Sequence, residues 1–294
     1  MEVLHPGARR RTVEAGEGVP VGAERDVTSG ATVLSVMAGP AAAPSPRTRL
    51  GGPIIDLSAD AHVHTGFAIG RDSVGAVVTA AERAGLDELT FADIVTPDAP
   101  WLPVYLKSIL RAQQRTEMTL RIAVEVEVAR PDGWLDFPTD LAGLDAISVA
   151  ISRLPLASGP ADVRRLHELL RIGVLSRAEV IELAIRATAK AVERASRYAP
   201  TQLARPLHLL WQLGIEESEV EDSTFAHLVD ACRVTGAVVE VSEAWRTPSV
   251  RLARQFVTAG VPLVAASDAR DAAQLGHWRY VARVLSGLAV ESVG

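Results

Sequence analysis

The sequence predicts an α/β barrel, in which parallel strands form the wall and helices cover the outside. From Ile54 onward, apolar runs of strand length alternate with longer amphipathic stretches, an alternation typical of parallel strands joined by helices. The chain has 294 residues, enough for one barrel of roughly 250 residues. Hydrophobic residues make up 48% of the chain but aromatic residues only 4%, so we expect an aliphatic core.

The apolar runs give the expected strands in chain order. They cover residues 54–61, 88–93, 120–128, 146–152, 206–211, 237–242 and 262–267. Apolar residues recur with helical spacing over residues 73–85, 103–115, 176–195, 223–234, 249–260 and 277–285. Ser176 with Glu179 three residues later predicts a capping box at the start of the third of these helices. In such barrels the functional groups gather at the carboxyl ends of the strands.

The first 50 residues differ from the rest of the chain. They are rich in Gly, Ala, Pro and Arg and lack sustained periodicity, so we expect residues 1–50 to be a disordered leader. One strand could form over residues 31–37. The barrel domain is expected over residues 53–294.

Charge and cysteine content exclude several classes of protein. A net charge of −6 argues against a nucleic-acid-binding surface, which is normally basic. Cys232 is the single cysteine, so an intramolecular disulfide is excluded and we expect a buried, inert thiol. We find neither a signal-peptide pattern nor an apolar run of about 18 residues. A cytoplasmic protein without membrane contacts is therefore expected, and its oligomeric state is not indicated.

Two histidines one residue apart are the first candidate metal ligands. His62 and His64 follow the first apolar run, and residues two apart on a strand share one face. Neutral imidazoles are common ligands of divalent metals. Such pairs also occur by chance or on solvated faces, so the motif needs support from elsewhere in the chain.

Carboxylates at the ends of other expected strands give that support. Glu125 and Glu127 alternate with valines, which places both acids on one face of a strand. A solvated edge face is the simpler explanation for such a pair. Asp268, however, ends another apolar run, Leu263 to Ser267. Imidazole and carboxylate ligands from separate strands suit a catalytic metal better than a structural one.

Several stretches together resemble the polymerase and histidinol phosphatase (PHP) domain family, most closely the version attached to family X DNA polymerases. The matching stretches are DAHVHTGFAIG at 60–70, ERAGLDELTFADI at 82–94, AVEVEVARPDGWLDFP at 123–138, LDAISVAIS at 144–152, RPLHL at 205–209, AVVEVSEAWR at 237–246 and SDAR at 267–270. They occur in family order and the resemblance covers about residues 53 to 290. It implies a distorted (β/α)7-type barrel and a metal-dependent phosphoesterase activity.

Three positions depart from the family pattern. Ile94, Ser152 and Arg270 stand where family members carry metal-binding histidines. The resemblance implies that these histidines serve the second and third metals of a trinuclear site. The set around the first metal is matched by His62, His64, Glu125 and Asp268. We therefore expect one divalent metal per chain, Zn²⁺, Mn²⁺ or Fe²⁺, in place of three.

Further residues are candidates for catalysis and substrate binding. His208 lies in a leucine run, where a histidine is more often a core residue than a ligand, but the resemblance matches it to a His-Pro position and makes it a candidate ligand and catalytic group. Asp93 could accept a proton from the attacking water. Arg246 and Arg270 are candidate clamps for an anionic substrate, although either could be an ordinary surface arginine.

Three functions remain open from the sequence. The first is a metal-dependent hydrolase of the PHP phosphoesterase type that acts on a small anionic substrate. The second is an amidohydrolase-like enzyme that hydrolyses amides or deaminates its substrate, because a His-x-His pair, a later histidine and a final aspartate also resemble that superfamily. The third is a degenerate domain with a binding or regulatory role, which the missing histidines favour.

Overall fold

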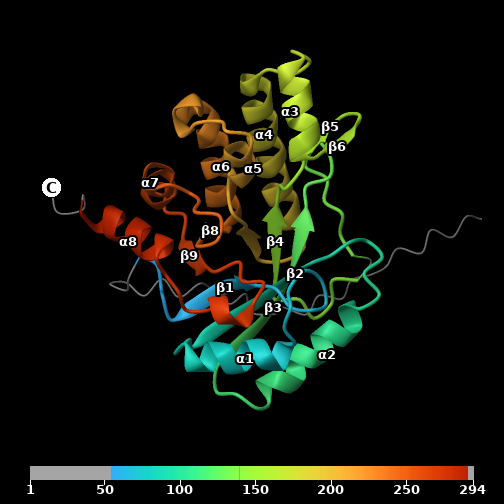
Figure 1. The fold of residues 1–294 in the computed structure, drawn as a ribbon, viewed down its shortest axis with the longest axis vertical. Helices are drawn as coiled ribbons and strands as arrows, with labels where there is room; N and C mark the ends of the chain where they lie inside the picture. Colours follow the sequence, from blue (N-terminus) through green and yellow to red (C-terminus); the bar gives the residue numbers. More distant parts are fainter. Residues whose placement is uncertain (1–53, 139, 291–294) are drawn as a thin grey trace, which may run out of the picture. The chain divides into compact units, whose positions relative to one another are not determined.

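Seven parallel strands form the centre of the fold in the computed structural model, which describes residues 54–138 and 140–290 (Figure 1). The strands are β1 (Ala59–Val63), β2 (Glu88–Ile94), β3 (Thr119–Glu127), β4 (Ala146–Ala150), β7 (Thr201–Leu203), β8 (Val238–Ser242) and β9 (Leu263–Ala266). Their order in the sheet is the same as their order in the chain. The predicted leader over 1–50 and the predicted strand over 31–37 lie outside the described residues.

The sheet is nearly closed, because its last strand returns to its first. Ala269, just after β9, forms a parallel bridge with Val63 in β1. The backbone N–H of Asp268 donates to the carbonyl of His62 at 3.0 Å, an ordinary distance for a backbone hydrogen bond. His64 and Asp268, 204 positions apart in the chain, thus lie side by side. The predicted distorted (β/α)7-type barrel is confirmed.

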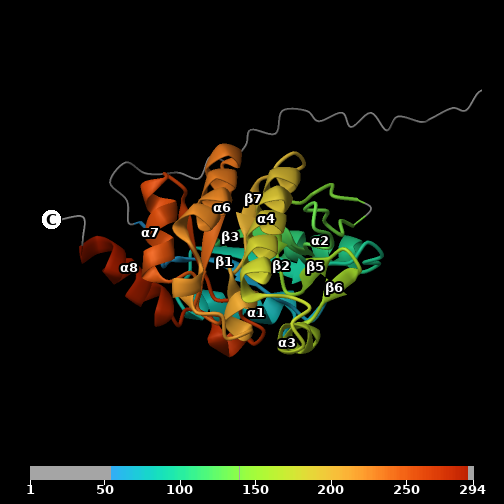
Figure 2. The ribbon, with the colours of Figure 1, turned by 90° about the horizontal axis from the view of Figure 1, so that it is seen from above.

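Helices cover the outside of this sheet. They are α1 (Val74–Arg83), α2 (Leu102–Gln113), α3 (Val163–Arg171), α4 (Arg177–Ala195), α5 (His208–Gln212), α6 (Asp222–Thr235), α7 (Val250–Thr258) and α8 (Tyr280–Val290), with short 3-10 helices over Glu217–Glu219 and Ala272–Gln274. Figure 2 shows α7 and α8 at one end of the view and α2 at the other, with β1, β2 and β3 between them. Helices join most of the successive parallel strands, as expected for crossover connections, whereas β3 and β4 are joined without a helix.

Serine residues mark the starts of three predicted helices. The side chains of Ser73, Ser176 and Ser249 accept hydrogen bonds from the first turns of α1, α4 and α7. At Ser176 the side chain of Glu179 also accepts from the Ser176 backbone N–H, so the predicted capping box is confirmed. These caps satisfy backbone donors that a helix start leaves unpaired.

The core is aliphatic, as predicted. Buried valine, leucine and isoleucine side chains pack between the sheet and the helices, and few aromatic rings join them. Cys232 in α6 is buried, and burial raises the pKa of its thiol to about 12. The predicted burial of the thiol is therefore confirmed, and its inertness stays a prediction.

Two expected strands are corrected by the structure. The first strand begins at Ala59 and not at residue 54, because Asp56 accepts a hydrogen bond from the Ser58 backbone N–H at 2.9 Å and so forms a local turn. The apolar run over 206–211 is not a strand. β7 ends at Leu203, and the chain then turns into helix α5 at His208.

The connection between β4 and β7 contains elements that the strand pattern did not predict. A two-stranded antiparallel hairpin forms from β5 (Leu154–Leu156) and β6 (Gly159–Ala161), and α3 follows it. Within the described residues, no helix is both long enough and apolar enough to cross a membrane.

Candidate metal centre

The two imidazoles of the predicted metal site lie together at the carboxyl end of β1. His62 is in the strand and His64 follows it directly, and both side chains are fully buried. Their ring centroids are 4.8 Å apart. The β1 end therefore presents two imidazoles to the same side of the barrel.

Glu125 on β3 joins this pair. Its Oε2 lies 3.1 Å from His62 Nε2 and 4.0 Å from His64 Nε2. One ligand atom from each of the three residues lies within 4.8 Å of the others. Two imidazole nitrogens and a carboxylate are a donor set that catalytic zinc sites use, so this buried His-His-Glu cluster could hold a metal.

Glu240 on β8 fixes the orientation of one imidazole. Its Oε1 is 2.6 Å from His62 Nδ1, so Nδ1–H donates to the carboxylate. In the neutral imidazole, the form that binds a metal, this leaves the lone pair on Nε2. Nε2 is buried and close to Glu125, yet it has no hydrogen-bond partner. A carboxylate behind a histidine and an unpartnered nitrogen in front of it is the arrangement of a metal-ligating imidazole.

Asp268 reaches the cluster because the barrel closes between β9 and β1. It is buried, has a positive φ of 54°, and places Oδ1 3.1 Å from His64 Nε2. Aspartate is one of the few residues other than glycine that adopt this left-handed backbone with some frequency. This conformation turns the chain at the end of β9 so that the carboxylate faces His64.

A buried arginine occupies the space between the two carboxylates. Arg205 follows β7 and donates from Nη1 to Glu125 Oε2 at 2.6 Å and to Asp268 Oδ2 at 3.2 Å. Its Nη2 donates to Glu125 Oε1 and, at 3.3 Å, to Ser152 Oγ. The guanidinium thus binds both oxygens of Glu125 in the bidentate geometry that arginine favours.

Charges inside the cluster shift the pKa values of its members. Burial alone would raise the pKa of Glu125 and of Asp268. The Arg205 guanidinium and the neighbouring histidines together outweigh burial and hold both pKa values well below their usual range. Burial would lower the pKa of His62, but Glu240 and the other carboxylates raise it well above its usual value. The cluster is therefore an anionic environment that attracts cations.

His208 lies beside this cluster without being part of the three-residue group. It begins α5, its ring centroid is 5.0 Å from that of Trp245, and its Nδ1 is 3.2 Å from the Arg205 carbonyl. Burial and the nearby Arg205 charge lower its pKa to about 3, so the imidazole is neutral at pH 7. Its predicted roles as ligand and catalytic group stay predictions.

Asp93 at the end of β2 is tied to the loop after β1. Its Oδ1 accepts from the Thr65 backbone N–H at 2.8 Å, and its Oδ2 accepts from the Thr65 hydroxyl. Oδ1 is also 3.8 Å from His64 Nδ1. Both oxygens thus hold the segment that carries His64, and a role as proton acceptor stays a prediction.

The two candidate substrate arginines lie in different places. Arg270 is exposed, and its guanidinium carbon lies 6.0 Å from the centroid of the Trp245 ring. The guanidinium carbon of Arg205 lies 5.9 Å from the same centroid. Arg246 is exposed, and its charge lowers the pKa of the phenol of Tyr280, the first residue of α8, against the effect of burial. Arg270 is therefore the candidate that shares a neighbour with the buried cluster.

Sequence reasoning missed Arg205 and Glu240, although both had a signal. Glu240 interrupts the apolar run Val238 to Val241, the same pattern that singled out Glu125. For Arg205 the signal is Pro206, the residue that follows it. The family resemblance assigns a His-Pro pair to this stretch. His208 is followed by a leucine, whereas Arg205 is followed by the proline and so takes the first position of that pair.

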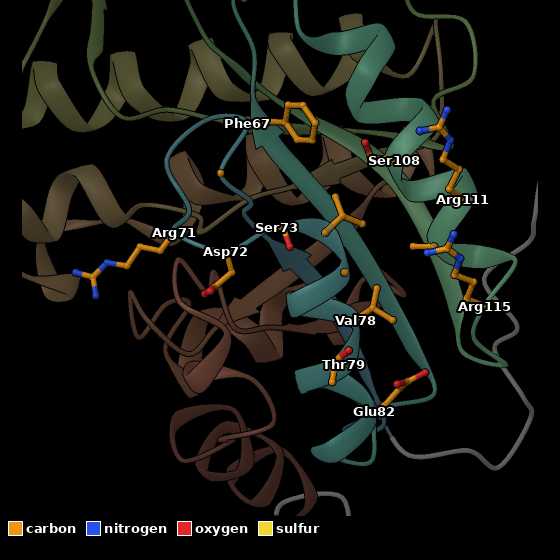
Figure 3. Close-up of a pocket in the computed structure, with 14 residues that line it drawn as sticks. Phe67, Arg71, Asp72, Ser73, Val78, Thr79, Glu82, Ser108, Arg111 and Arg115 are labelled. Carbon is orange, nitrogen blue, oxygen red and sulfur yellow. The ribbon is translucent and has the colours of Figure 1, made fainter.

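A separate cavity lies away from the cluster. It has a volume of about 690 Å³ and is lined by residues of the loop after β1, of α1 and of α2. Figure 3 shows Val78, Thr79 and Glu82 on α1 facing this space, with Ser108 on α2 across from them. None of the cluster residues lines it, so a molecule in this cavity would not touch the candidate metal centre.

Comparisons with known proteins support the fold. No protein-family model matches the chain, and no curated protein matches it. A solved structure from Listeria monocytogenes, provisionally designated the histidinol phosphatase HisK, is similar with a TM-score of 0.56 and 13% identity, over 76% of this chain and 99% of that chain. A short-chain dehydrogenase from Oenococcus oeni PSU-1 aligns with a TM-score of only 0.29 and 11% identity, over 72% of this chain and 97% of that chain.

The Listeria structure shows that the two chains share a fold, and at this identity it shows no more than that. Its designation agrees with the family that the sequence motifs resemble. The closer likeness to the family X polymerase version, and the roles of individual site residues, stay predictions.

Proposed function

We propose that this protein is a metal-dependent hydrolase of the PHP phosphoesterase type that acts on a small anionic substrate with one divalent ion. The observation that carries the proposal is the buried Nε2 of His62, which has no hydrogen-bond partner while Glu240 holds Nδ1. An orphaned nitrogen that faces a second histidine and a glutamate suits a metal ligand. His62, His64 and Glu125 would hold the ion, with Asp268 beside His64 and His208 nearby.

The ion would supply Lewis acidity and an activated water when bound, as zinc, manganese and iron do in hydrolases. The chain itself supplies the surroundings. Glu240 keeps His62 in the tautomer that leaves Nε2 free, and Asp93 fixes the segment of His64 through Thr65. Asp93 is also the carboxylate that we assign to accept the water proton.

Anionic substrates are favoured by the arginines outside the cluster. Arg270 is exposed and lies near the Trp245 ring that also neighbours Arg205, so its guanidinium can bind a phosphate or carboxylate that approaches the site. Arg246 is a second candidate, farther toward α8. The small-molecule substrate and the cytoplasmic location expected from the sequence belong to the same proposal.

A second candidate function is a binding or regulatory domain without hydrolysis. The observation that favours it is Arg205, which takes both oxygens of Glu125 and one of Asp268. The amidohydrolase-like alternative uses the same histidines and aspartate, so only its substrates distinguish it from the phosphoesterase.

A substrate screen tests the proposal. Protein reconstituted separately with Zn²⁺, Mn²⁺ or Fe²⁺ is assayed against phosphomonoesters, phosphodiesters and amides. We expect phosphoester hydrolysis that a chelator abolishes and that His62→Ala abolishes, whereas His167→Ala, a change at an exposed histidine on α3, retains it. Amide hydrolysis alone would favour the amidohydrolase alternative, and inactivity with every metal would favour the binding domain.

A further inference from the structure

We propose that Arg205 is a built-in cation that competes with a divalent metal for Glu125 and Asp268. Its guanidinium pairs with both carboxylates, and an ion can take their oxygens only by displacing it. The inference rests on the metal site of the proposed function, but not on the reaction that this site performs.

The burial and contacts of Arg205 carry the first step. Among the described residues it is the one lysine or arginine that is buried, with 3% of its side chain exposed. Its fork reaches Glu125 on β3 and Asp268 after β9. A buried charge without a partner is very unfavourable, so the guanidinium and the two carboxylates stabilise one another only as a set.

The contested atoms give the second step. Oε2 of Glu125, which lies 3.1 Å from the orphaned His62 Nε2, is the atom that accepts from Arg205 Nη1 at 2.6 Å. Likewise, Asp268 accepts from Arg205 through Oδ2 while its Oδ1 faces His64. A metal bound by these oxygens would lie next to a second positive charge in a buried site, where repulsion is strong. Both cations cannot occupy these carboxylates together.

The backbone around Arg205 holds the guanidinium in place. The residue has a positive φ of 33°, a conformation that is uncommon for a bulky side chain. Its backbone N–H donates to Glu240 Oε2 at 3.2 Å, so Glu240 fixes both His62 and the turn that carries Arg205. The carboxylate that orients His62 thus also positions the backbone of Arg205, whose side chain enters the cluster.

Metal affinity and thermal stability test the competition without any assay of activity. The full chain and its Arg205→Met variant are titrated with Zn²⁺ against a competing chelator, and both are melted in EDTA and in Zn²⁺. We expect the variant to bind Zn²⁺ about tenfold or more tightly than the wild type, the scale on which groups around a metal site alter its affinity. Zn²⁺ should raise the melting temperature of the wild type modestly, because the ion must displace Arg205. The variant should melt lower than the wild type in EDTA and gain more from Zn²⁺.

Arg71→Met is the matched control, because it makes the same change at an arginine with 79% of its side chain exposed. It should leave Zn²⁺ affinity unchanged. If Arg205→Met does not fold in either buffer, Arg205→Lys decides, since a lysine keeps the charge but cannot bridge two carboxylates with a fork. It should bind Zn²⁺ more tightly than the wild type.

An affinity in the Arg205 variants equal to that of the wild type would overturn the inference. Its failure is distinct from failure of the proposed function. Tighter binding without hydrolysis would leave the competition standing and refute the hydrolase. Metal-dependent hydrolysis with unchanged affinity in the variants would do the reverse.

Discussion

Glu240 Oε1 lies 2.6 Å from His62 Nδ1, although the two residues are 178 positions apart in the chain. The same carboxylate accepts hydrogen bonds from the Gln202 side chain, the Ser148 hydroxyl and the backbone N–H of Arg205. Glu240 is fully buried. It therefore connects the first strand of the barrel to β4, β7 and β8 at the base of the candidate metal centre.

Glu240→Gln should destabilise the fold, because an amide NH₂ would replace one of two acceptor oxygens and face a donor. We expect a loss of about 1 to 3 kcal/mol in the free energy of unfolding, the usual effect of leaving a buried polar group unsatisfied. Denaturant unfolding in EDTA measures it. Glu193→Gln, at an exposed position on α4, should stay within about 0.5 kcal/mol of the wild type. Equal stability of both variants would contradict this role of Glu240.

Asp60 predicts a pH dependence of stability. Burial raises its pKa from 3.8 to about 6, although Ser267 donates to it. Because the folded state disfavours the charged form, the unfavourable contribution is absent below pH 4, grows through pH 4 to 6 and is complete above pH 6. Asp60→Asn removes this contribution. Its stability relative to the wild type should rise by up to about 3 kcal/mol between pH 4 and pH 7.

Unfolding free energies in EDTA at several pH values test the Asp60 prediction. Asp98→Asn, at an exposed position before α2, serves as the control and should show no such rise. A stability difference between Asp60→Asn and the wild type that is flat from pH 4 to pH 7 would show that the carboxylate ionises freely in the folded protein.

Cys232 should be unreactive in the native protein. Its thiol is buried in α6 and burial raises its pKa to about 12, so the nucleophilic thiolate is scarce at pH 8. We expect a thiol reagent to label one cysteine per chain rapidly in guanidinium chloride and negligibly in native buffer. Rapid labelling of native protein would contradict the buried position.

Arg270→Ala should weaken the binding of an anionic substrate and leave metal content unchanged. The loss of a charge-assisted hydrogen bond would raise the dissociation constant by about tenfold or more. Equilibrium binding of a phosphorylated substrate from the screen measures it, alongside elemental analysis of the same sample. Unchanged affinity would make this arginine an ordinary surface charge.

The sequence predicted the barrel and the histidine pair because both depend on local patterns. Strand and helix periods repeat along the chain, and His62 and His64 are neighbours in it. The carboxyl ends of parallel strands meet at one end of a barrel, so Glu125 and Asp268 could be placed beside them in advance.

What the sequence did not predict depends on backbone turns and on ion pairs between distant strands. The left-handed conformations of Arg205 and Leu207 end β7 early and start α5, so the run over 206–211 is helical at His208. Arginine is normally exposed. Nothing in the local pattern showed that Arg205 would be buried between carboxylates 80 and 63 positions away.

In the proposed function, His62 and His64 bind one metal ion. X-ray absorption spectroscopy of the zinc-loaded chain, combined with elemental analysis, tests it most directly. We predict about one zinc per chain, with two imidazole nitrogens at roughly 2.0 to 2.1 Å and oxygen ligands completing the coordination, and loss of the zinc in the His62→Ala variant. Three tightly bound ions per chain, or a zinc signal without imidazole ligands that survives in His62→Ala, would contradict the claim.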